Sequence, residues 1–103
     1  MQPLPQSRVN EWHVLIEESI GGGGSGDGSF RVTAVLPIGP DVEQARAVAA
    51  DRALRHRPAA PLRPKGRWVF QLSPDSWLVD VKGARRRFHF RVSVALLTAV
   101  ADS

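Results

Sequence analysis

At residues 77–92 the chain reads WLVDVKGARRRFHFRV, and bulky apolar side chains recur there at every second position. Successive side chains of a β-strand point to opposite faces, so this period of two predicts two strands joined by a turn at Gly83. One face of each strand is then apolar. The bulky positions are Trp77, Val79 and Val81 in the first strand, and Phe88, Phe90 and Val92 in the second.

The same alternation occurs in three earlier segments, residues 11–20, 30–36 and 67–72. Each is rich in aromatic and β-branched residues and is bounded by glycine, proline or small polar residues, which is typical of strands. We expect their apolar faces to pack inward. The expected inward sets are Trp12, Val14, Ile16 and Ile20; Phe30, Val32, Ala34 and Leu36; and Trp68, Phe70 and Leu72.

Residues 41–57 have the spacing of a helix instead. Asp41 is suited to cap its N-terminus, and Pro58 is suited to end it. An apolar stripe at helical spacing predicts the side that packs on the sheet. The stripe consists of Val42, Ala45, Ala49 and Ala53.

Together these elements predict a single small α+β domain, ββαβββ, over residues 11–101: an antiparallel sheet with one helix packed on one face. We expect 1–10 to be a flexible N-terminal segment, 21–29 a glycine-rich hairpin tip, and 58–66 a proline-rich loop. The apolar run after Val92 either extends the last strand or forms a short C-terminal helix capped by Ser93. We favour the helix.

Composition limits the function classes. The chain has 103 residues and no cysteine, which argues for one domain and excludes disulfides, cysteine-ligated metals and a cysteine nucleophile. The net charge is +4, with 14 Lys and Arg against 10 Asp and Glu. No apolar run is long enough to cross a bilayer, and residues 1–10 do not resemble a secretory signal. We therefore expect a soluble, cytoplasmic protein.

A row of cations is the sharpest functional feature. In a strand, Arg85, Arg87, His89 and Arg91 share one face at intervals of roughly 6–7 Å. Such a row could follow a phosphate backbone. One expectation argues against nucleic-acid binding. Every aromatic side chain should point to the other face, where it could not stack on bases.

The sheet face away from the helix is expected to be too apolar for water, because Leu15, Val35, Val69 and Leu78 lie between its charges. A protein partner, which could be a second copy of the chain, would cover this face. We therefore expect a non-catalytic protein-binding or accessory module that acts, through this face, as a homodimer or as a subunit of a complex. The alternative is a nucleic-acid-binding module that uses the arginines. The expected partner-binding residues are Arg85, Arg87, His89, Arg91, Leu15, Val69 and Leu78.

Catalytic, metal-binding and cofactor-binding residues are not expected. The glycines of 21–26 match a dinucleotide-binding spacing, but a strand pattern rather than a helix follows them. None of the three histidines, His13, His56 and His89, stands at the spacing of a metal site or of a catalytic triad. The sequence therefore predicts a binding protein that holds no cofactor.

Overall fold

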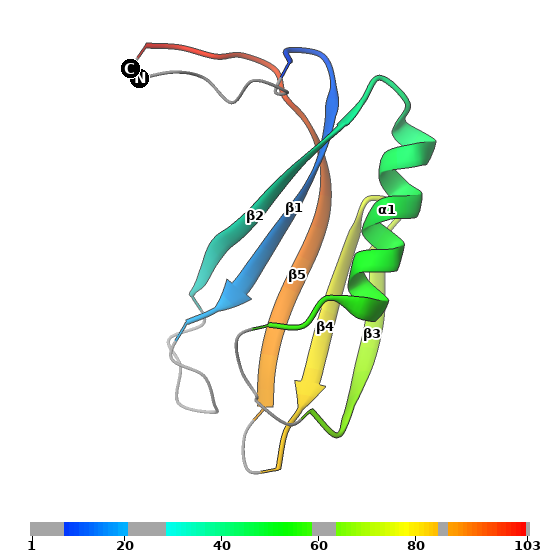
Figure 1. The fold of residues 1–103 in the computed structure, drawn as a ribbon, viewed down its shortest axis with the longest axis vertical. Helices are drawn as coiled ribbons and strands as arrows, with labels where there is room; N and C mark the ends of the chain where they lie inside the picture. Colours follow the sequence, from blue (N-terminus) through cyan, green and yellow to red (C-terminus); the bar gives the residue numbers. More distant parts are fainter. Residues whose placement is uncertain (1–7, 21–28, 59–63, 85–86, 103) are drawn as a thin grey trace.

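The computed structural model describes residues 8–20, 29–58, 64–84 and 87–102, and it confirms the ββαβββ order. The strands form one antiparallel sheet in the order β2-β1-β5-β4-β3, and α1 lies against one face of it (Figure 1). The elements are β1 (Trp12–Ser19), β2 (Phe30–Gly39), α1 (Val42–Arg55), β3 (Gly66–Ser73), β4 (Ser76–Lys82) and β5 (Arg87–Leu96).

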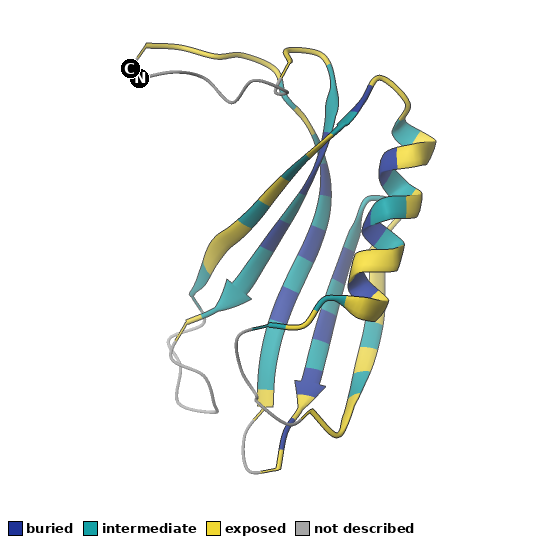
Figure 2. Ribbon diagram, in the orientation of Figure 1, coloured by how far each residue is buried: buried dark blue, intermediate teal, exposed yellow. Residues whose placement is uncertain are grey.

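The core lies between α1 and the three central strands, as the burial colours in Figure 2 show. Ala45, Ala49 and Ala53 are fully buried, which confirms the predicted stripe. Alanines allow the helix axis to approach the sheet closely, so the larger strand residues fill the interface. These are Val14, Ile16, Trp77, Val79, Val81, Phe90, Val92 and Val94.

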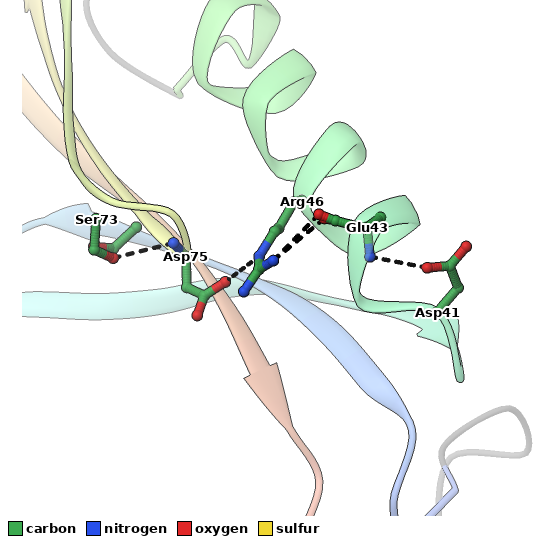
Figure 3. A network of polar contacts seen from close by, with 6 residues as sticks. Asp41, Glu43, Arg46, Ser73 and Asp75 are labelled. Carbon is green, nitrogen blue, oxygen red and sulfur yellow. Dashed lines mark hydrogen bonds and ion pairs between the residues drawn. The ribbon is translucent and has the colours of Figure 1, made fainter.

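Polar contacts fix the start of the helix (Figure 3). The Asp41 carboxylate accepts a hydrogen bond from the Glu43 backbone N–H at 2.9 Å, which confirms Asp41 as the N-cap. Arg46 donates from Nε to Asp75 at 2.7 Å and from Nη1 to Glu43 at 3.2 Å. The hydrogen bonds to Asp75 and Glu43 raise the pKa of the Arg46 guanidinium. This network ties the first helical turn to the β3–β4 turn.

The other end of the helix is held by Arg67 of β3. Its guanidinium donates to the Ala53 carbonyl at 3.0 Å and to the His56 carbonyl at 2.9 Å. A cation is favourable there, because unpaired carbonyls at a helix C-terminus carry partial negative charge. Desolvation, followed by the charge of Arg57, lowers the pKa of Arg67. Arg67 therefore points toward the helix side of the sheet.

The expected C-terminal helix is wrong. β5 continues to Leu96, and residues 97–102 have no regular secondary structure. The strand continues because β1 pairs with β5 as far as Leu96, whereas the β4 ladder ends at Ser93. Val92 and Val94 point into the core. Residues 97–102 run away from the end of the sheet and not across the face opposite the helix (Figure 1).

The expected inward set of β3 is also wrong. Trp68, Phe70 and Leu72 are 45%, 52% and 62% exposed, whereas Val69 packs against the core opposite Val79. The cause is a register shift between Gln71 and Ser73. Leu72 is an extra residue in the ladder, and one extra residue reverses which face the rest of the strand presents.

The expected inward set of β2 is wrong in part, because a second register shift lies between Ile16 and Glu17. Ala34 and Leu36 pack against the core as expected, but Val32 is exposed and lies opposite Glu17. Ile20 was expected inward; it lies beyond the end of β1 and is exposed. The glycine-rich tip at 21–28, most of the proline-rich loop (59–63) and Arg85 lie outside the described residues.

Because α1 packs closely on the sheet, a larger side chain in its alanine stripe should destabilise the fold. We expect Ala49→Leu to lower the free energy of unfolding by about 1–3 kcal/mol, because the added side chain must displace the sheet. Ala47 lies on the exposed side of the same helix, so Ala47→Leu should change it by less than about 0.5 kcal/mol. Urea denaturation measures both. Equal effects would contradict the placement of the alanine stripe.

Candidate interaction surface

The face of the sheet away from α1, called the open face below, has its side chains in rows across the strands. One row runs from β2 to β3 through Val32, Glu17, Arg91, Leu78 and Phe70. Cross-strand partners in such a row lie close enough for their side chains to contact each other. Charged groups in the centre of the row are therefore flanked by apolar groups at both sheet edges.

Arg91, in the centre of the open face, has two partners. Its Nη2 lies 3.4 Å from Glu17 Oε2, and its guanidinium carbon lies 4.0 Å from the centre of the Phe30 ring. A guanidinium at this distance from an aromatic ring gains cation–π attraction. Arg91 is thus held by a carboxylate on one side and by a ring on the other.

A similar arrangement surrounds Arg87. Its Nε lies 3.9 Å from Asp80 Oδ2, and its guanidinium carbon lies 5.5 Å from the Trp68 ring centre. Asp80 also lies 3.6 Å from His89 Nε2. Asp80 and Trp68 are cross-strand partners, as are Asp80 and His89, so a second row places the acid between the imidazole and the indole.

The cations form the outer layer of the open face, and the acids lie beneath them. The Arg87 and Arg91 side chains are 60% and 43% exposed, whereas those of Asp80 and Glu17 are 17% and 25% exposed. A partner approaching this face would therefore meet the guanidinium groups first. The hydrogen bond from Arg91 to Glu17 orients this arginine and reduces the number of rotamers that binding would have to restrict.

The expectation that the aromatic residues all point away from the cations is wrong. Trp68, Phe70 and Phe30 share the open face with the arginines, because the two register shifts reverse the alternation that the sequence suggested. Large exposed apolar groups of β2, Val32 and Val35, extend the same surface. The open face therefore combines cations with rings and aliphatic side chains.

Five of the seven expected partner-binding residues lie on the open face: Leu15, Leu78, Arg87, His89 and Arg91. Val69 does not, because it packs against the core on the helix side. Arg85 lies outside the described residues. The residues that the sequence reasoning missed are Trp68, Phe70 and Phe30. No alternation within a single strand could have found them, because a bulge becomes visible only when two strands are paired.

Two histidines lie beside carboxylates. His89 and Asp80 are on the open face, whereas His56 Nε2 lies 2.8 Å from Glu18 Oε2 at the end of α1. His13 is buried, and its Nδ1 lies 3.1 Å from the Glu11 carbonyl. In the described parts of the chain, no three metal-ligating side chains come together. In these same parts, no helix is long and apolar enough to cross a membrane.

Comparison with protein-family models, with curated proteins and with solved structures returned no match.

The position of Trp68 leads to a paired prediction. Trp68→Ala removes an exposed ring and should lower the free energy of unfolding by less than about 1 kcal/mol, which is the loss of one exposed cation–π contact. Trp77→Ala removes a ring that is only 6% exposed and should cost about 3–5 kcal/mol. Chemical denaturation of both variants measures the difference. A larger cost at Trp68 than at Trp77 would place Trp68 in the core.

Proposed function

We propose that the protein is a non-catalytic binding module whose open face takes a protein partner that presents carboxylates among apolar side chains. The observation that carries this proposal is the pair of exposed arginines, Arg87 and Arg91, each placed between a half-buried carboxylate and an aromatic ring. An incoming carboxylate could accept hydrogen bonds from the remaining guanidinium donors. Phe70, Val32 and Val35 offer apolar contact around them.

The residue types of the open face also support a protein partner. Tryptophan and arginine are enriched among the residues that contribute most to protein interfaces. Exposed aliphatic side chains such as Val32 and Val35 gain free energy when a partner removes them from water. Because Arg91 is already held by Glu17 and by the Phe30 ring, binding would restrict less side-chain motion there than it would for a free arginine.

A face-to-face homodimer, which the sequence led us to expect, has weaker support than a different partner. A two-fold axis through the centre of the open face would place β5 of one copy across β5 of the other. Arg87 and Arg91 lie on that strand, so cations of the two copies would approach each other at the centre of the interface. A partner with acidic groups at this position avoids the repulsion.

Single-stranded nucleic acid is the second candidate, favoured by the presence of Trp68 and Phe70 on the same face as the arginines. Bases stack on exposed rings, and phosphates pair with cations. It ranks second because aliphatic side chains, among them Val32 and Val35, lie on the same face as the arginines and offer bases no ring on which to stack.

The proposal is tested with tagged baits in a lysate of the native cells. We expect the intact protein to enrich a specific protein that Arg87→Ala/Arg91→Ala loses. Arg52→Ala/Arg57→Ala removes the same charge from exposed positions at and after the helix C-terminus and should retain that protein. Quantitative mass spectrometry compares the three baits. Enrichment of the same proteins by all three would contradict the proposal.

The nucleic-acid alternative is tested in parallel by fluorescence anisotropy with labelled oligo-dT and oligo-U. We expect only weak binding, which both double variants reduce alike and which moderate salt abolishes. Binding that survives physiological salt and that Trp68→Ala and Arg91→Ala each weaken several-fold would instead establish the second candidate.

A further inference from the structure

β3 forms one edge of the sheet, and its outer side has no strand partner among the described residues. Its eight residues, Gly66–Ser73, contain no proline and only one charged side chain. That charge, Arg67, points to the end of α1, so it does not hinder the approach of another strand to the edge. Free backbone N–H and C=O groups along such a strand can pair with another strand.

The opposite edge, β2, differs in each of these respects. β2 contains Pro37, which has no backbone N–H to donate, and an exposed charge at Arg31. A proline and an exposed charge hinder edge-to-edge pairing. Register shifts occur in both edge strands, beside Thr33 in β2 and at Leu72 in β3, so they do not distinguish the two edges. An added strand is therefore better accommodated at β3 than at β2.

The sequence of β3 is also suited to pair with itself. If two copies run antiparallel about a two-fold axis at Phe70, then Phe70 lies opposite Phe70 of the second copy. Val69 then lies opposite Gln71 of the second copy. Beyond Gln71 the bulge at Leu72 makes the strand irregular, so the regular pairing is centred on residues 69–71. This register gives the exposed Phe70 ring an apolar neighbour across the axis and brings no like charges together.

We propose that the protein forms a two-fold symmetric dimer in which the β3 strands pair antiparallel and join two sheets into one of ten strands. The occupant of the β3 edge is thus a second copy of this chain. A two-fold axis perpendicular to the sheet leaves both helices on one side and both open faces on the other. The two sets of Arg87 and Arg91 then lie on one continuous surface, which would bind a partner at two points.

The dimer is tested by sedimentation velocity over a range of protein concentrations. We expect the intact chain to sediment as a species of twice its 11.3 kDa mass. Phe70→Lys and Phe70→Glu should each be monomeric, because like charges would then face each other at the two-fold axis. An equimolar mixture of the two variants should recover the dimer. Val32→Lys adds the same charge to an exposed position of β2 and should leave the dimer intact.

A crosslinking experiment tests the register directly, since the chain has no cysteine. Residues opposite each other in an antiparallel pair have Cα atoms about 4.5–5.5 Å apart, within reach of a disulfide. We expect Phe70→Cys to form a disulfide-linked dimer on mild oxidation. Val32→Cys should form none at the same concentration.

Several results would overturn the dimer: a monomeric intact chain at high concentration, a dimer that survives both charge substitutions, or a mixture that stays monomeric. Near-UV circular dichroism of each variant shows whether it has folded, and a folded Phe70→Cys that does not crosslink also counts against it. The inference does not rest on the proposed function. Dimer formation at the β3 edge is measured with the purified chain alone, whereas partner binding by the open face is tested by replacing Arg87 and Arg91.

Discussion

One extra residue in β3 decides what the open face presents. Gln71 lies opposite Trp77 and Ser73 lies opposite Ser76, so Leu72 is left over in the ladder. Without this bulge, Phe70 would lie opposite Val79 and point toward the helix. With it, Val69 occupies that place, and Phe70 and Trp68 move to the open face. The aromatic content of the open face thus follows from the register of a single hairpin.

Contacts on the helix side hold this register. Arg67 reaches the Ala53 and His56 carbonyls only because the odd-numbered residues of β3 point toward α1. Its guanidinium also lies 5.7 Å from the centre of the Phe90 ring. The alanine stripe leaves little space under the helix for a tryptophan and a phenylalanine of β3. A slip by one residue would bury those rings and remove the cation from the helix end.

The open face and the β3 edge are parts of one arrangement. Trp68 and Phe70 lie on the last strand of the sheet, so they flank the arginines and also border the unpaired edge. Pairing of two β3 strands would bury part of these rings and leave the Arg87 and Arg91 positions accessible. A dimer could therefore enlarge the binding surface without occupying its charged centre.

Much of the fold could be predicted from the sequence, because local patterns determine its elements. The alternation at 77–92, the alanine stripe and the Asp41 cap each depend on residues near in the chain. The face of each strand depends on pairing, and two bulges reversed it for part of β2 and for β3. The pairing of Glu17 with Arg91 joins residues 74 positions apart, which a pattern along the chain does not reveal. β5 extends through 93–96 because residues 12–15 of β1 pair with it there, and the local apolar run alone did not decide between strand and helix.

The most direct test of the account is the set of nuclear Overhauser effects from the Trp68 indole protons. We predict contacts with the side chains of Arg87 and Asp80, together with contacts between the Val69 methyl groups and the core around Val79. Contacts from the Trp68 indole to Ala53 or to other residues of α1 would place the ring under the helix. They would contradict both the register of β3 and the open face derived from it.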